Sequence, residues 1–130
     1  MKNEIFQLTL VVREYDEAIS FYTEKLGFEL LEDTVLSESK RWVRVSPPGS
    51  RMSLLFGKAA SEEQQKSIGN QTGGRVFLFM YTDDLDGYYA QLKAGGVEIV
   101  REPSEESFGK VLVFADLYGN LWDLIEPPKT

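Results

Sequence analysis

One acidic residue, Asp123, lies in the middle of an otherwise apolar run at 121–125, near the end of the chain. A carboxylate in such a run either faces solvent or points into a cavity. In a cavity it pairs with a cationic ligand, or acts as a general base with a pKa raised by burial. The alternative is a structural carboxylate that is hydrogen-bonded to polar neighbours. We favour a role of Asp123 in ligand binding.

Two arginines flank a tryptophan in the segment 41–45, which contains Arg41, Trp42 and Arg44. Because side chains alternate along a strand, Arg44 shares a face with Trp42. An arginine beside a ligand can clamp a carboxylate or phosphate, or stack on an aromatic ring. The alternative is that both arginines point outward from an edge strand. The sequence leaves both interpretations open.

The chain contains no histidine and no cysteine. This composition excludes disulfide bonds, zinc–thiolate and iron–sulfur sites, thiol nucleophiles and every nucleophile that a histidine activates. Histidine is also the commonest ligand of transition metals in proteins. Any chemistry of this chain must therefore rely on carboxylates, hydroxyls, amides and basic side chains.

The charge balance is 14 basic against 21 acidic residues, a net charge of −7, without a basic cluster. Such a chain is a poor candidate for binding the phosphates of nucleic acids. No apolar run reaches the 18 or so residues of a membrane span, and no signal peptide is visible. We expect a cytoplasmic protein with no nucleic-acid or membrane partner.

Hydrophobic periodicity predicts the same order of elements twice, strand–helix–strand–strand–strand. In the first half, Asp16 is a suitable N-cap and Gly27 a suitable stop for a helix. The strands are expected at 5–12, 28–31, 41–45 and 52–56, with a loop over 34–39. The apolar face of the helix holds Ala18, Phe21, Tyr22 and Leu26.

The second half begins with a strand at 76–81 and a helix that ends at Gly95-Gly96. A strand at 97–100 and a loop over 103–108 follow. The chain closes with a hairpin of 111–115 and 121–125, whose turn contains Gly119-Asn120. Both halves therefore predict a βαβββ module in an α+β fold.

A polar stretch without periodicity joins the two halves. It is long for a connection in a compact domain and is predicted to be a linker or lid, with a short helix around 61–66. The predicted division is a first module over about 1–57, a linker over about 58–74 and a second module over about 75–130, all in one domain.

Three segments resemble the vicinal oxygen chelate superfamily: EAISFYTEKLGFEL at 17–30, DDLDGYYAQLKAGGVEI at 83–99 and VFADLYGNLWDLIEP at 113–127. This superfamily includes glyoxalase I, extradiol dioxygenases, fosfomycin resistance enzymes and bleomycin-binding proteins. The resemblance implies two βαβββ modules that form a curved mixed-sheet cleft. It also implies a homodimer, since modules of the family often pair across subunits.

Metal-dependent members of the family have four ligand positions, which by resemblance fall on Gln7, Ser53, Phe77 and Asp123, with Leu54 in place of Ser53 if the register slips by one. Phe77 cannot bind a metal and a serine hydroxyl is a poor ligand. Two ligands without imidazole hold a transition ion weakly at best. We therefore expect no metal or other cofactor, with at most a weak divalent ion at Gln7 and Asp123. The absence of histidine excludes the dioxygenase chemistry.

The resemblance and strand alternation together give the expected ligand-binding residues. They are Gln7, Thr9, Trp42, Arg44, Ser53, Phe77, Phe79, Tyr81 and Asp123. Together they would form apolar walls with a few polar anchors. The alternative for Phe77 and Phe79 is that they only pack in a core.

Three functions are compatible with these residues. The first is a metal-independent protein that binds a small drug or metabolite, as in the drug-sequestering branch of the family. The second is a lyase or isomerase of glyoxalase type, with Asp123 as base and Arg44 stabilising an oxyanion. The third is an orphan module that works through protein contacts.

Overall fold

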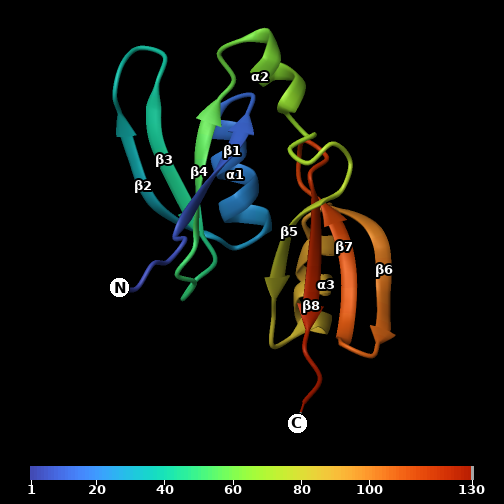
Figure 1. Ribbon diagram of the computed structural model, residues 1–130. Coiled ribbons are helices and arrows are strands. Elements are labelled where there is room, and N and C mark those ends of the chain that lie inside the picture. The colour runs from blue at the N-terminus through green and yellow to red at the C-terminus, as the bar shows by residue number, and fades with distance from the viewer. Residues whose placement is uncertain (130) are drawn as a thin grey trace. The chain divides into compact units, whose positions relative to one another are not determined.

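The computed structural model describes residues 1–129 and divides the chain into two compact units, Met1–Ile68 and Gly69–Thr130. Each unit contains one four-stranded sheet and a helix that follows the first strand of that sheet (Figure 1). The α+β fold with two βαβββ modules is thus confirmed. None of the helices in residues 1–129 is long and apolar enough to cross a bilayer.

The first unit has the strand order β1-β4-β3-β2, in which β1 and β4 are parallel and the other pairs antiparallel. Its elements are β1 (Gln7–Val12), α1 (Tyr15–Ser20), η1 (Phe21–Lys25), β2 (Glu29–Val35), β3 (Arg41–Ser46), β4 (Ser53–Lys58) and α2 (Glu62–Ser67). The short helix expected around 61–66 is present as α2, and the side chain of Ser61 caps it by accepting a hydrogen bond from the backbone N–H of Gln64.

The core of the first unit lies between the sheet and α1–η1. Alternate strand residues are buried on this side: Leu10, Val12, Val43, Val45, Leu54 and Phe56. The Tyr22 ring lies 5.5 Å from the Phe56 ring and 5.4 Å from the Phe28 ring, so the aromatic residues join helix and sheet. The opposite side carries Gln7, Thr9, Glu32, Trp42, Arg44 and Ser53, which we call the polar face.

The first helix differs from its prediction. Its N-cap is Glu14 rather than Asp16, and no side chain caps it. The second half of the expected helix is a π-helix, η1, in which the backbone N–H of Leu26 bonds to the carbonyl of Phe21, 3.3 Å away. The wider turn keeps Phe21, Tyr22 and Leu26 buried.

Strand β2 is longer than predicted. The sequence predicts a strand that ends at position 31 and a loop that begins at position 34. In the structure, the residues from Glu32 to Val35 also pair with β3. Backbone pairing with β3 outweighs the low strand propensity of these polar residues. As a consequence Glu32 lies opposite Arg44 in the sheet.

The second unit repeats this topology with the order β5-β8-β7-β6. Its elements are β5 (Val76–Tyr81), α3 (Leu85–Ala94), β6 (Glu98–Glu106), β7 (Gly109–Ala115) and β8 (Leu121–Glu126). The loop predicted at 103–108 is mostly strand, because β6 continues past Pro103 with two register irregularities. Proline is tolerated there because β6 is an edge strand.

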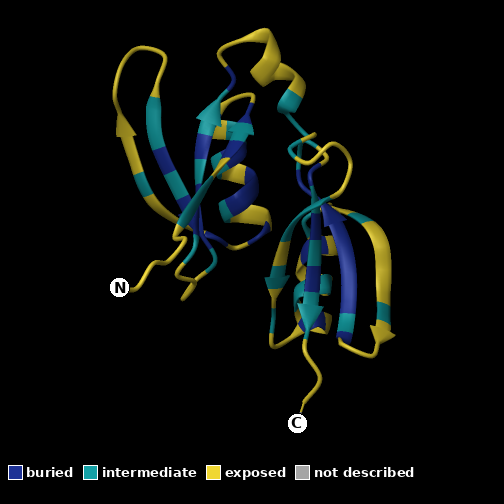
Figure 2. Cartoon of the chain, viewed as in Figure 1, coloured by how far each residue is buried: buried dark blue, intermediate teal, exposed yellow. Residues whose placement is uncertain are grey.

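The core of the second unit lies between the sheet and α3. Leu112 and Leu124 are fully buried, and the rings of Phe114 and Trp122 stack 5.7 Å apart. Figure 2 shows buried residues along β7, with exposed ones along the edge strand β6. The opposite side carries Phe79, Tyr81, Arg101, Val113, Asp123 and Ile125, which we call the aromatic face.

The predicted hairpin of β7 and β8 is present, with a loop at 116–120. Gly119 has a positive φ of 97° whereas Asn120 does not. Asp116 organises the loop, since one of its carboxylate oxygens accepts hydrogen bonds from the backbone N–H groups of Tyr118 and Asn120, each at 2.9 Å. This role of Asp116 was not predicted from the sequence.

Candidate functional site

The polar face of the first unit is centred on Arg44. Its Nε donates to Oε1 of Gln7 at 2.7 Å, Nη1 to Oε1 of Glu32 at 3.2 Å, and Nη2 to Oγ of Ser53 at 3.4 Å. Ser53 Oγ lies 3.1 Å from the same Gln7 oxygen. We call Gln7, Glu32, Arg44 and Ser53 the Arg44 cluster.

The strand registers bring these four residues together. Gln7 pairs with Ser53 across the parallel strands β1 and β4, and Arg44 pairs with Glu32 across β2 and β3. Leu54 lies in the core. Of the two registers considered for β4, the structure therefore has the one that puts Ser53 beside Gln7.

Arg41 and Arg44 point to opposite sides of the sheet. Arg41 binds Asp33 with two hydrogen bonds of 3.1 and 2.7 Å and Asp16 at 2.8 Å, and its guanidinium lies over the Tyr15 ring. Arg44 lies on the same face as Trp42 and Thr9. The alternative of two outward arginines on an edge strand does not hold. Strand β3 lies between β4 and β2, and the Arg41 and Arg44 side chains, 24% and 25% exposed, are both hydrogen-bonded.

A divalent metal ion does not fit the first unit. The two positions that resemble metal ligands, Gln7 and Ser53, already receive hydrogen bonds from the positively charged guanidinium of Arg44. A metal ion bound to their oxygens would lie against this fixed charge. Among residues 1–129, no three carboxylates converge as a metal-binding group.

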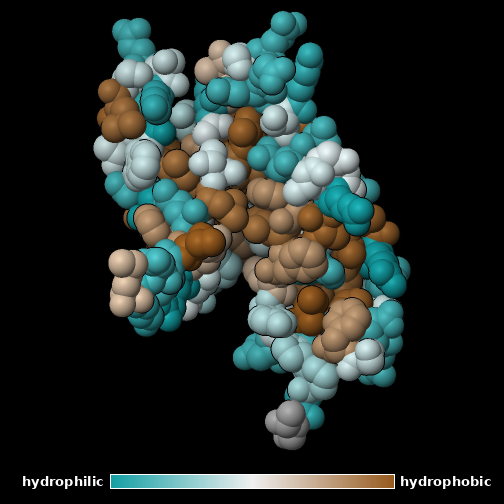
Figure 3. Space-filling model, viewed as in Figure 1, coloured by the Kyte–Doolittle hydropathy of each residue, from teal (hydrophilic) through white to brown (hydrophobic). Residues whose placement is uncertain are grey.

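The aromatic face of the second unit carries two aromatic side chains that are largely exposed, Phe79 at 66% and Tyr81 at 77%. Together with Met80 and Ile125 they line a hollow of about 260 Å³. Figure 3 shows apolar side chains at the surface in the region where Figure 1 draws β5 and β8. Exposed aromatic rings around a hollow are typical of small-molecule sites.

Asp123 is half-buried on this face, between Phe79 on β5 and Val113 on β7. Among residues 1–129 it has no hydrogen-bond donor. Burial raises the pKa of the Asp123 carboxyl, and the positive charge of Arg101 opposes part of this rise. A carboxylate without a donor, beside exposed rings, is suited to bind a donor or a cation of a ligand.

The structure shifts one expected position. Asp123 pairs with Phe79, as Ser53 pairs with Gln7 in the first unit, so Phe79 rather than Phe77 corresponds to Gln7. Phe77 lies at a register irregularity between Val76 and Leu78. Counting residues along the sequence could not detect this irregularity.

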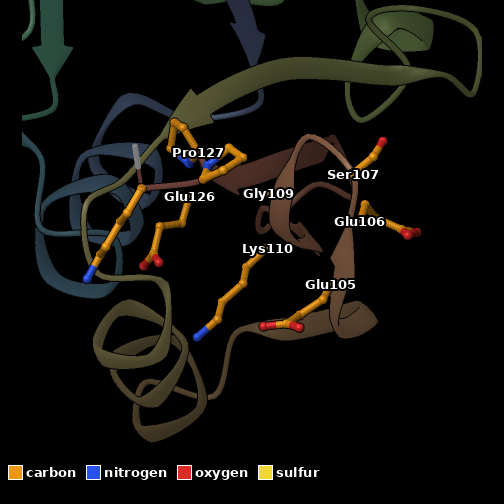
Figure 4. Close-up of a pocket in the computed structure, with 9 residues that line it drawn as sticks. Glu105, Glu106, Ser107, Gly109, Lys110, Glu126 and Pro127 are labelled. Atoms are coloured by element: carbon orange, nitrogen blue, oxygen red, sulfur yellow. The ribbon is translucent and has the colours of Figure 1, made fainter.

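Two further hollows lie elsewhere. One of about 450 Å³ surrounds the end of the β6–β7 hairpin, and Figure 4 shows Lys110 and Glu126 among its lining residues. Lys110 pairs with Asp86, which raises the Lys110 pKa, and Glu126 accepts the backbone N–H of Leu85. The other, of about 510 Å³, lies around Arg41 and its two carboxylates. The charged groups named in both hollows already have partners.

Two charged residues of these faces, Glu32 and Arg101, were not among the predicted ligand-binding residues. Both lie in the edge strands β2 and β6, just beyond the strands predicted at 28–31 and 97–100. No alternation along the sequence could have found Glu32, because the register shifts between Leu30 and Glu32, and Leu30 pairs with the core residue Val45. Of the predicted residues, Gln7, Arg44 and Ser53 come together in the first unit, and Phe79 and Asp123 in the second.

Comparison with known proteins gives consistent matches along the chain. A family model described as the Glyoxalase/Bleomycin resistance protein/Dioxygenase superfamily matches residues 4–124. An uncharacterized protein of Shewanella frigidimarina is 55% identical, covering 97% of this chain and 95% of its own.

Two solved structures are similar over nearly their full length. UcmS2 has a TM-score of 0.84 and 29% identity, covering 96% of this chain and 98% of its own. TnmS3, an antibiotic binding protein from Streptomyces sp. CB03234, has a TM-score of 0.80 and 28% identity, covering 98% of both chains.

Proposed function

Because the chain belongs to the Glyoxalase/Bleomycin resistance protein/Dioxygenase superfamily, we propose that it binds a small organic molecule, a drug or a metabolite, without a metal ion. The ligand has a flat aromatic part and a hydrogen-bond donor or positive charge. Binding rather than chemistry is the primary activity in this proposal.

The observation that carries the proposal is the environment of Asp123. Partial burial raises the pKa of the Asp123 carboxyl, so its ionisation costs free energy there, and the protein keeps it next to two exposed aromatic rings. A ligand that stacks on Phe79 and Tyr81 and donates to Asp123 would satisfy the carboxylate and cover the rings together. TnmS3, an antibiotic binding protein that is similar over nearly the whole chain, supports a small-molecule ligand such as a drug.

The absence of a metal is part of the proposal and is supported by the Arg44 cluster, where the guanidinium already binds Gln7 and Ser53. A homodimer and a cytoplasmic location belong to the same proposal. Light scattering on the purified protein tests the first, and cell fractionation the second.

The test compares a flat aromatic cation, 9-aminoacridine, with its uncharged parent, acridine, by thermal shift and calorimetric titration. A true ligand raises the melting temperature by mass action. We expect 9-aminoacridine to bind more tightly than acridine. Asp123→Asn should remove this difference. Phe79→Ala should lower the affinity for both compounds about tenfold, which corresponds to the loss of about 1.4 kcal/mol of stacking.

The matched control is Phe108→Ala, which truncates another exposed phenylalanine of the second unit, in the turn between β6 and β7. It should bind both compounds as the unchanged protein does. Equal affinities of the unchanged protein and Asp123→Asn for 9-aminoacridine would contradict the proposal, as would a stoichiometric divalent ion in the purified protein.

A second candidate is a lyase or isomerase of glyoxalase type. It is favoured by one observation, the raised pKa of the Asp123 carboxyl, which makes it a stronger base. In this alternative Asp123 removes a proton from a substrate bound on the aromatic face of the second unit. Exchange of a substrate C–H with deuterated water, lost in Asp123→Asn, would identify such an enzyme.

A further inference from the structure

We infer that the Arg44 guanidinium takes the place of a metal ion in the first unit and binds an anionic oxygen, such as a carboxylate, of an aromatic ligand. The inference rests on the proposed function in one respect, that the chain binds a small molecule. It concerns the polar face of the first unit and does not depend on Asp123.

The guanidinium is held in place and still has donors to offer. Arginine has five N–H groups, and Arg44 uses one each toward Gln7, Glu32 and Ser53. One N–H therefore remains on Nη1 and one on Nη2. Two N–H groups on neighbouring nitrogens match the two oxygens of a carboxylate.

The partners of Arg44 differ in how easily a ligand replaces them. Gln7 and Ser53 are uncharged, and Ser53 is buried. Glu32 is the only carboxylate of the Arg44 cluster, and its side chain is 42% exposed. An incoming anion can replace Glu32 as a partner of the Arg44 guanidinium. The Glu32 carboxylate then points into solvent, while Gln7 and Ser53 hold the guanidinium.

Arg41 shows what a purely structural arginine looks like in the same strand. It has two carboxylate partners at 2.8 Å or less, Asp16 and Asp33, and its side chain is 24% exposed, close to the value for Arg44. Two negative charges compensate the single positive charge of Arg41. Arg44 has one carboxylate partner, so displacement of Glu32 leaves a full positive charge for the ligand.

The surroundings of Arg44 favour an aromatic anion over a simple ion. Trp42 lies two residues away on the same face and is only partly buried, and Thr9 is exposed on β1. An aromatic ring can pack against the indole while its carboxylate reaches the guanidinium.

The experiment titrates the full chain with 2-naphthoate and with the uncharged 2-naphthamide, followed by NMR of ¹⁵N-labelled protein. We expect naphthoate to bind about tenfold more tightly, equal to about 1.4 kcal/mol for a charge-assisted hydrogen bond. The largest shifts should occur at Gln7, Arg44 and Ser53. Mn²⁺ should produce no saturable broadening of these signals.

Three variants separate recognition from structure. Arg44→Gln should remove the preference for naphthoate, whereas Arg41→Gln should keep it. Glu32→Gln should strengthen naphthoate binding several-fold, because the competing negative charge is gone while every residue that holds the guanidinium stays. A purely structural Arg44 would give no gain in Glu32→Gln, so this variant decides the question even if Arg44→Gln folds poorly.

The inference is overturned if naphthoate and naphthamide bind equally, if the shifts fall on the second unit, or if Mn²⁺ binds at Gln7 and Ser53. Asp123→Asn distinguishes this failure from failure of the proposed function. It should leave the preference for naphthoate intact while removing the preference for 9-aminoacridine over acridine.

Discussion

At the scale of single residues, two aspartates near the end of the chain behave in opposite ways. Asp116 is 5% exposed, but it accepts hydrogen bonds from the backbone N–H groups of Tyr118 and Asn120 and from Nδ2 of Asn120. Asp123 is more exposed and has no donor among residues 1–129. A buried carboxylate is tolerated where its oxygens are satisfied, so Asp116 serves the loop and Asp123 is available for a ligand.

The raised pKa of Asp123 predicts a stabilising substitution. A carboxyl with a higher pKa in the folded state binds its proton more tightly there, so ionisation destabilises the fold. Asp123→Asn should therefore raise the free energy of unfolding at pH 7, by less than about 1 kcal/mol because the group is only partly buried. Urea unfolding of both proteins at pH 7 measures the gain.

The pH dependence of the stability gain in Asp123→Asn tests the sign of this effect. Below the pKa of the unfolded state, near 3.9, both states are protonated and the gain should vanish. It should grow as the pH rises and become complete above the raised pKa of the folded state. Asp116→Asn replaces a carboxylate whose oxygens already accept hydrogen bonds, so it should instead lower the free energy of unfolding at pH 7. A gain that is constant between pH 4 and 7 would contradict this account.

At the scale of elements, two helices have similar N-caps but different positions in the fold. Ser61 caps α2 and Asp84 caps α3, each accepting the backbone N–H three residues later. Helix α2 buries none of its residues, whereas α3 buries Leu85 and Leu92 in the core. The stability of the second unit therefore depends on α3 much more than the stability of the first unit depends on α2.

Removal of the two caps should have different consequences. Asp84→Ala should lower the free energy of unfolding by about 1 kcal/mol, the usual value of an N-cap. Ser61→Ala should cost less than about 0.3 kcal/mol globally, because α2 can fray while the core stays intact. Thermal unfolding followed by circular dichroism measures both. Equal losses would show that α2 belongs to the cooperative core.

The strands show how much of the fold can be predicted from the sequence. Continuous apolar runs predict strands best, and β5 at Val76–Tyr81 was predicted to the residue. The edge strands β2 and β6 were predicted too short, because their polar residues and Pro103 are stabilised only by pairing with β3 and β7. Register is set by backbone pairing between distant segments. Gln7, Arg44 and Ser53 were therefore predicted from the sequence, whereas Glu32 was not.

At the scale of the whole molecule, the chain is built from two units with separate cores. Phe56 is 1% exposed in the first core and Phe114 is fully buried in the second. Each phenylalanine lies on a central strand, beside the helix that covers its own sheet. Every residue of the Arg44 cluster belongs to the first unit, and Phe79 and Asp123 belong to the second.

Separate cores predict local responses to core substitutions. Phe56→Ala and Phe114→Ala should each lower the free energy of unfolding of their own unit by about 3–5 kcal/mol, because apolar burial is lost and a cavity forms. Hydrogen exchange followed by mass spectrometry should then show faster exchange in β1, β3 and β4 for Phe56→Ala, and in β5, β7 and β8 for Phe114→Ala. Because each variant is the control for the other, equal acceleration in both units would mean that the two cores open together. In that case a ligand bound to either face would stabilise the whole chain, whereas separate opening confines its protection to the unit that binds it.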